Sequence, residues 1–316
     1  MRYFYLLFVL ISIMSCGENE MDNISSTLIL PIPPRLQWEN GHGYCGETSI
    51  QAIALYHGVW ISQQIVRNVA GGELLVGINS DKALETLKFD FESWDWNNEP
   101  TPQYKTFMPW MKKHLQNKTP IVFATFLADD EDSPDYDHIE PAIGIKINDI
   151  RKEGFDPEDE LIFYNDFDKK QIKRPFKDLH SSREGCKSDL DDGGCIPNDY
   201  DYGVAIKGIL DKQKITKPVQ LVVSHWDEPN VSEGKAPRQM NALVIVSDLL
   251  KGQKYSLLRF EDYNKVPTEG TCSHFLTSEY VLRVDFIATD VQWYYNDPVP
   301  FSSDGVLYYR VVCLED

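Results

Sequence analysis

The order of the secondary-structure patterns limits the fold of this chain most strongly. Apolar residues recur at helical spacing in four early segments, residues 46–57, 62–70, 80–87 and 101–116. The pattern then changes to short β-rich runs, residues 120–127, 139–147, 161–164, 171–176 and 203–209. Helices that precede an antiparallel sheet are expected of an α+β domain.

Beyond residue 218 the helical pattern disappears. Short strand patterns alternate there with turns rich in Pro, Gly and Asn, and they cover residues 219–224, 241–246, 255–260, 280–289 and 306–312. About a hundred residues of this kind predict an all-β sandwich. The 316 residues are long enough for two cores. We therefore predict an α+β domain over residues 31–214 and a β-sandwich over residues 215–316.

The N-terminus has the pattern of an export signal. Arg2 precedes an apolar run, Tyr3 to Met14, which is too short to span a bilayer comfortably. A small residue, Ser15, then precedes Cys16, and acidic residues follow, as in a bacterial lipoprotein signal. Residues 1–16 are thus interpreted as a signal with Cys16 as the lipidated residue, and residues 17–30 as a polar tether. An ordinary secretory signal with an incidental cysteine is the alternative.

The charge of the chain limits its partners. A formal net charge of −18 disfavours nucleic acid or an anionic membrane surface as the main ligand. We expect a protein of the cell envelope, at the outer membrane or cell surface, or else a secreted one. Its membrane contact would be the lipid on Cys16 alone, and we expect a monomer.

Six cysteines fit an oxidising compartment. With Cys16 assigned to lipid, an even number remains besides Cys45, and this favours disulfides. The spacing favours Cys186 with Cys195 and Cys272 with Cys313. A zinc site is the other reading, but no Cys-x-x-Cys spacing supports it. We expect neither a metal nor a cofactor.

Cys45 is the candidate nucleophile. It directly precedes the first helical segment, where unpaired backbone N–H groups and the helix dipole favour thiolate over thiol. Gln37, eight residues upstream, offers a side-chain donor that can join the Cys45 N–H in holding an oxyanion.

A cysteine nucleophile needs a histidine and a polar group that orients the histidine. His138 opens a strand pattern, and the next strand pattern ends in Asn165 and Asp166. Alternation places Asn165 and Asp166 on opposite faces, so one of them serves, and we favour Asp166. His57 lies on the apolar side of the first helical segment and is interpreted as a core residue. His114 is expected on the polar face of the fourth.

These residues, in the order Gln37, Tyr44-Cys45-Gly46, His138 and Asp166, resemble the papain-like peptidases of the bacteriocin double-glycine leader-peptidase group. They are most similar to the exported peptidase-like relatives of that group. The resemblance spans roughly residues 35–210 and implies a papain-like fold. It further implies Cys45 as nucleophile, His138 as base, Asp166 as orienting acid and Gln37 in the oxyanion hole. Glu47 stands where the family commonly has Pro. The C-terminal domain resembles fibronectin-like modules by pattern alone.

Two classes of function follow. The first is an exported cysteine peptidase that hydrolyses peptide or isopeptide bonds of a protein substrate through an acyl-enzyme. Acyl transfer by the same triad is a variant of it. The second is a catalytically silent scaffold or binding lipoprotein whose β-sandwich binds protein or glycan.

Overall fold

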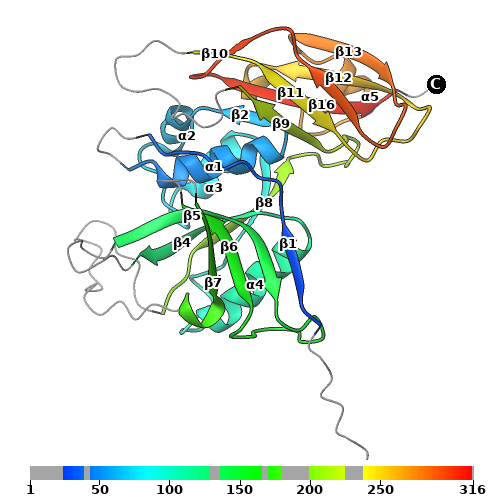
Figure 1. Cartoon of the computed structure of the whole chain (residues 1–316). Helices are drawn as coiled ribbons and strands as arrows, with labels where there is room; N and C mark the ends of the chain where they lie inside the picture. The colour runs from blue at the N-terminus through cyan, green and yellow to red at the C-terminus, as the bar shows by residue number, and fades with distance from the viewer. Residues whose placement is uncertain are drawn as a thin grey trace, which may run out of the picture.

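The computed structural model describes residues 24–38, 43–127, 136–165, 170–179, 199–224 and 238–314. These residues form a mixed α+β structure of mostly antiparallel sheets and few helices. In Figure 1 a large sheet occupies one end of the molecule, smaller sheets occupy the other, and α1, α2 and α3 lie between them. The described helices are α1 (Cys45–Tyr56), α2 (Gln63–Ala70), α3 (Ser80–Thr86), α4 (Tyr104–Gln116) and the short α5 (Cys272–Leu276).

The large sheet has seven strands in the described residues. Six of them run in the order β3-β8-β4-β5-β6-β7, and β1 pairs with β5. The strands are β1 (Ser26–Ile29), β3 (Phe89–Ser93), β4 (Ile121–Leu127), β5 (Tyr136–Ile147), β6 (Glu160–Tyr164), β7 (Gln171–Pro175) and β8 (Gly203–Ile209). The pairings in this sheet are antiparallel.

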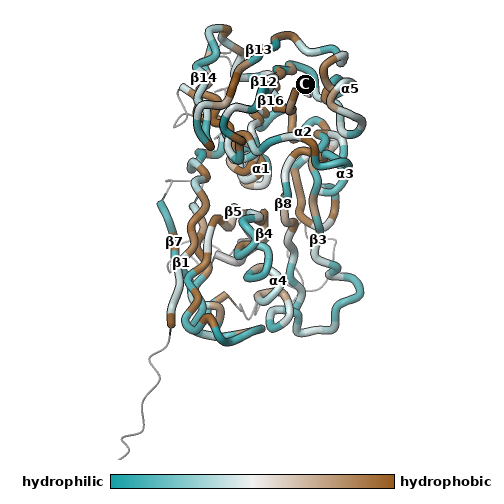
Figure 2. Tube along the Cα trace, turned by 90° about the vertical axis from the view of Figure 1, so that its right-hand side faces the viewer, coloured by the Kyte–Doolittle hydropathy of each residue, from teal (hydrophilic) through white to brown (hydrophobic). Residues whose placement is uncertain are grey.

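Helices cover both faces of the large sheet. Ile50 and Ile53 of α1 share a core with Val122, Ile139 and Ile143 on one face. On the other face, apolar residues of α4 pack against alternate residues of the same strands; this second core contains Phe107, Met111, Leu115, Phe123, Leu161 and Phe163. Figure 2 shows β7 and β3, the two ends of the sheet, to either side of α4. The strands are therefore buried on both sides, which explains their continuous apolar runs.

The C-terminal part contains three smaller sheets. Four strands run in the order β13-β12-β16-β2, three in the order β14-β11-β9, and β10 pairs with β15. Their bounds are β2 (Val59–Ile61), β9 (Val219–Val223), β10 (Gln239–Met240), β11 (Ala242–Val246), β12 (Lys254–Phe260), β13 (Leu282–Ile287), β14 (Trp293–Asn296), β15 (Phe301–Ser302) and β16 (Val306–Cys313). Alternate residues of the first two sheets share one apolar core.

Strand β2 links the two predicted domains. It follows α1 in the chain, yet it pairs with β16, with Trp60 opposite Leu307. The Trp60 indole also donates to the Ser303 carbonyl at 3.2 Å, and the Tyr308 hydroxyl donates to the Leu87 carbonyl at 2.8 Å. Residues on both sides of the predicted boundary at 214/215 thus belong to common sheets and cores.

The last residues of the predicted tether belong to the large sheet. Ser26–Ile29 form β1 and pair with Gly144–Ile147 of β5. Gly144 permits this approach, because a Cβ there would lie 2.4 Å from the Leu28 carbonyl oxygen. The short run Ser-Thr-Leu-Ile follows Ser25 and has β propensity, although it lies in the segment that the sequence indicates as a polar tether.

The predicted disulfide between Cys272 and Cys313 is wrong, because neither cysteine is part of a disulfide. Cys272 starts α5 and packs against the core that contains α1, whereas Cys313 ends β16 and packs against the core of the C-terminal sheets. Cys186, Cys195 and Cys16 lie outside the described residues. Within those residues each helix is too short or too polar to cross a lipid bilayer.

Two histidines of the helical segments are packed side chains. His57, at the C-terminal end of α1, has its Nε2 3.1 Å from the Ile206 carbonyl oxygen, consistent with the predicted core role. His114 does not lie on a polar face as expected. It is buried, its ring stacks edge-on to Trp110 with 4.6 Å between centroids, and its Nε2 lies 3.2 Å from Glu92.

His57 makes stability depend on pH. Burial lowers the pKa of its imidazole from 6.5 to about 4. The unfolded chain therefore binds more protons than the folded one between these values, and stability falls as the pH falls through this window. Between pH 7 and pH 5 this group should remove about 2 kcal/mol of stability. Urea unfolding of wild type and His57→Gln at both pH values measures the difference. Equal pH dependence in the two proteins would rule out this role.

Candidate active site

Cys45 is the first residue of α1, which starts one residue earlier than the sequence predicts. Tyr44 precedes it as the N-cap residue, without a side-chain cap. The backbone N–H groups of the first turn have no partner inside the helix, and they present the positive end of the dipole to the Cys45 sulfur. Cys45 is partly exposed, whereas the ten residues after it are buried. The thiol thus lies at the exposed start of a buried helix.

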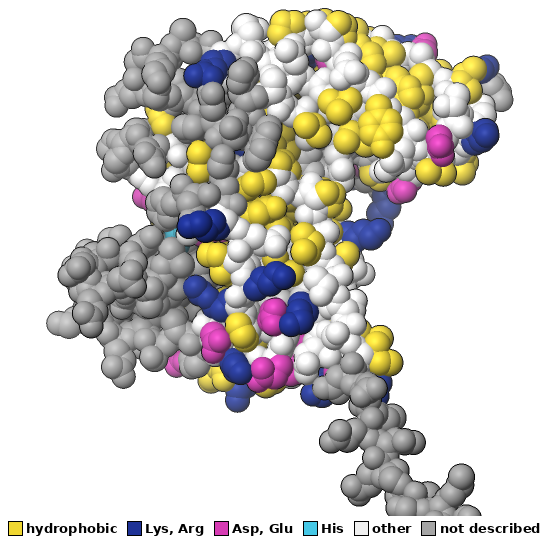
Figure 3. Space-filling view, viewed as in Figure 1, with side chains coloured by type: hydrophobic (Ala, Val, Ile, Leu, Met, Phe, Trp, Pro, Cys, Tyr) yellow, Lys and Arg dark blue, Asp and Glu magenta, His cyan; other side chains and the backbone are white. Residues whose placement is uncertain are grey.

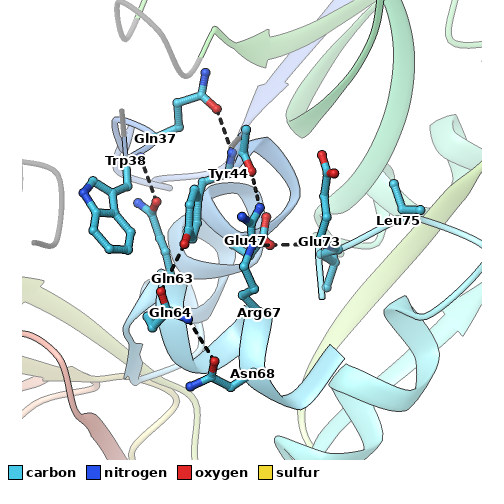
Figure 4. Close-up of polar contacts among 12 residues, drawn as sticks. Gln37, Trp38, Tyr44, Glu47, Gln63, Gln64, Arg67, Asn68, Glu73 and Leu75 are labelled. Carbon is cyan, nitrogen blue, oxygen red and sulfur yellow. Dashed lines mark hydrogen bonds and ion pairs between the residues drawn. The ribbon is translucent and has the colours of Figure 1, made fainter. Parts of the chain in front are cut away.

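Gln37 lies at this helix start despite its distance in sequence. Its side-chain Oε1 accepts a hydrogen bond from the Tyr44 backbone N–H at 3.0 Å, and the side chain is buried (Figure 4). The amide is therefore fixed one residue before Cys45. With the oxygen occupied, the Nε2 group is the part of this side chain that can donate to an oxyanion.

Arg67 of α2 holds the segment around Cys45 from the opposite side. Its Nε lies 2.7 Å from the Glu47 carboxylate, its Nη2 donates to the Gly43 carbonyl, and its guanidinium lies over the Tyr44 ring at 3.6 Å (Figure 4). These contacts bind residues on both sides of Cys45 to α2. They fix the position of the thiol-bearing turn.

Glu47 completes this clamp from inside the protein. Its side chain is fully buried and also accepts from the Leu74 backbone N–H at 3.1 Å. Burial raises the pKa of the carboxyl, and the bond and charge of Arg67 oppose that shift. The sequence marked Glu47 only as a departure from the family. Arg67 lies 20 residues later in the chain, so the pairing depends on how α1 and α2 pack.

The first turns of α1 contact β5 beside His138. A Cβ on Gly46 would lie 3.2 Å from Ile139 Cδ1, and Ser49 Oγ donates to the Ile139 carbonyl at 3.3 Å. Gly46 directly follows Cys45 in the chain, and Ile139 directly follows His138. The close approach of Gly46 and Ile139 therefore brings the backbone at Cys45 near the backbone at His138. This arrangement brings the predicted nucleophile and base to the same end of β5.

The side chain of His138 leaves β5 on the face opposite to Ile139. In the register with β4, His138 lies opposite Thr125 and Glu140 opposite Phe123, and Phe123 belongs to the core on the α4 side. Ile139 packs in the α1 core. The imidazole of His138 therefore leaves the sheet on the α4 side, whereas Cys45 packs against the core on the α1 side.

Glu140 is a candidate site residue that our sequence analysis missed. Its Oε1 lies 3.3 Å from His138 Nε2, and the two side chains are 0% and 3% exposed. Their spacing of two residues along a strand was the signal, because such residues share a face. Asp166 lies outside the described residues. Within the described residues, no group of His, Cys, Asp and Glu side chains is placed to hold a metal ion.

Comparison with known proteins adds no assignment. A scan against protein-family models and a search of curated proteins each found no match to this chain. What the fold and the site define is therefore a mixed α+β protein with a cysteine at a buried helix start beside a strand that carries a buried histidine.

Proposed function

We propose that this protein is an exported cysteine hydrolase that cleaves peptide or isopeptide bonds, with a papain-like domain followed by a β-sandwich of the fibronectin type. The observation that carries the proposal is the contact of the Cys45 helix start with β5 at Ile139, next to His138. In this proposal the lipid on Cys16 anchors the protein in the cell envelope.

The proposed chemistry uses the side chains of Cys45, His138 and Gln37. His138 accepts the thiol proton of Cys45, and the thiolate attacks the carbonyl carbon of the substrate. The backbone N–H of Cys45 and the Gln37 amide hold the resulting oxyanion. The imidazolium returns its proton to the leaving amine as the carbon–nitrogen bond breaks, which leaves a thioester. Water, deprotonated by His138, then releases the acid; an amine in place of water gives acyl transfer. The resemblance assigns Asp166 the orientation of the imidazole.

Alkylation of the purified chain with iodoacetamide at pH 6.5 tests this proposal. Cys45 should react at least about tenfold faster in wild type than in His138→Ala, because an imidazolium stabilises the thiolate. Peptide mass spectrometry measures each cysteine separately, so Cys313 is an internal control whose rate should not change. Cys45→Ala identifies the labelled peptide. A Cys45 rate that is slow and indifferent to His138 contradicts the proposal.

A second candidate is a binding protein without turnover. One face of the sheet β14-β11-β9 carries Val222, Leu243, Ile245 and Tyr294, none of which packs in the core of the C-terminal sheets. Val222 is 49% and Tyr294 58% exposed. Figure 3 shows hydrophobic side chains gathered over these C-terminal sheets on one side of the molecule. The buried position of His138 on the face away from α1 also favours this candidate, in which Cys45 alkylation is independent of His138.

A further inference from the structure

His138 has a buried acidic neighbour on its own strand. Strand alternation places His138 and Glu140 on one face of β5, and the Nε2–Oε1 distance is 3.3 Å. A carboxylate is rarely fully buried unless it is paired. This burial therefore indicates that the structure uses the Glu140 charge locally. A carboxylate on the Nε2 side of the ring leaves Nδ1, on the other side of it, for a proton from elsewhere.

Arg174 of β7 brings a positive charge to the same face. In the sheet register Arg174 lies opposite Leu161, which belongs to the core on the α4 side. Its guanidinium extends across β6, over the Phe163 ring at 5.6 Å, and Nη1 lies 3.5 Å from Thr125 Oγ1. Thr125 is the residue opposite His138. Three strands thus contribute one cluster, with Thr125, His138, Glu140 and Arg174.

The charges within this cluster interact. Burial lowers the pKa of the Arg174 guanidinium, and the negative charges of Glu140 and Asp178 oppose that shift. Glu140 and Arg174 are thus electrostatic partners within the cluster. On the α4 side of the sheet, His138 thus has the Glu140 carboxylate as a neighbour, and the Arg174 guanidinium belongs to the same cluster.

We propose that Glu140, which has Arg174 in the same cluster, is the residue that orients His138, in the role that the family resemblance gives to Asp166. This proposal rests on the cysteine-hydrolase function proposed above. When the Cys45 thiol proton moves to Nδ1, His138 becomes a cation and Glu140 stays an anion, so the thiolate–imidazolium pair gains a third charge that stabilises it. Glu140 acts through His138 and is a positioning residue.

Glu140→Gln and Asp166→Asn, each of which keeps the size of its side chain, form a matched pair for the test. The rate of Cys45 alkylation by iodoacetamide is measured from pH 4 to pH 9 in the whole chain for wild type, both variants and His138→Ala. We expect Glu140→Gln to lower the rate about tenfold at pH 6.5 and to move the thiolate limb of the profile to higher pH. Asp166→Asn should retain the wild-type profile, and Glu140→Asp should recover most of the rate.

The outcomes separate the two proposals. A wild-type profile in Glu140→Gln together with a shifted profile in Asp166→Asn overturns the role of Glu140 and leaves the hydrolase proposal standing. A wild-type rate that His138→Ala does not change overturns both. If Glu140→Gln fails to fold, the double variant Glu140→Gln, Arg174→Met removes the buried cation as well. It should show the same shifted profile, and an unshifted profile in it overturns the role of Glu140.

Discussion

Replacing Glu47 with alanine will lower the free energy of unfolding by about 3–5 kcal/mol, because it leaves a largely buried cation without its partner. The Glu47 side chain is 0% exposed and that of Arg67 14%. The substitution also removes the acceptor of the Leu74 N–H, and an unpaired buried donor is itself unfavourable. Because Arg67 also binds the Gly43 carbonyl, the loop before Cys45 should loosen with it.

Urea unfolding followed by circular dichroism measures this effect. Glu73→Ala is the matched control, because Glu73 lies near Arg67 but is exposed. Its effect should stay within about 0.5 kcal/mol. If the two variants lose the same stability, the pair between Glu47 and Arg67 is not the contact that holds the helix start.

Asp297→Ala should have a similarly large effect on the C-terminal sheets. Asp297 Oδ2 lies 2.7 Å from Arg259 Nη1, and both side chains are fully buried. The Tyr309 hydroxyl donates to the same carboxylate, and the Val299 N–H donates to its Oδ1 at 2.9 Å. Truncation therefore leaves one cation and two donors inside the protein, and we expect a loss of about 3–5 kcal/mol.

The exposed pair of Lys212 and Glu269 is the control for this variant. Its side chains are 54% and 59% exposed, with 2.7 Å between Nζ and Oε2. Glu269→Ala should cost no more than about 1 kcal/mol, because water and salt screen such pairs. Thermal unfolding of both variants gives the comparison. A loss below 1 kcal/mol for Asp297→Ala would show that the buried pair contributes little beyond packing.

Several strands were not predicted, because the partner strands that stabilise them lie far away in the sequence and near only in the folded protein. Val59–Ile61 is a run of three residues, and it becomes a strand because β16 lies beside it. Phe89–Ser93 alternates apolar and acidic residues, yet it pairs with β8, which follows more than a hundred residues later. Partners at such separations cannot be read from a window of one segment, since pairing depends on the tertiary contact.

By itself, the sequence determined that the four longer helical segments precede most of the strands, that a helix starts at or next to Cys45, and that a strand carries His138. Apolar periodicity and residue type are local properties, and they are sufficient for these features. Only the tertiary structure decided that Gln37 reaches Tyr44, that Glu47 pairs with Arg67, and that β2 joins the C-terminal sheet. The tertiary structure also decided that the Glu140 carboxylate lies beside His138. The physical reason is that a buried charge takes whichever partner the packed chain brings near it.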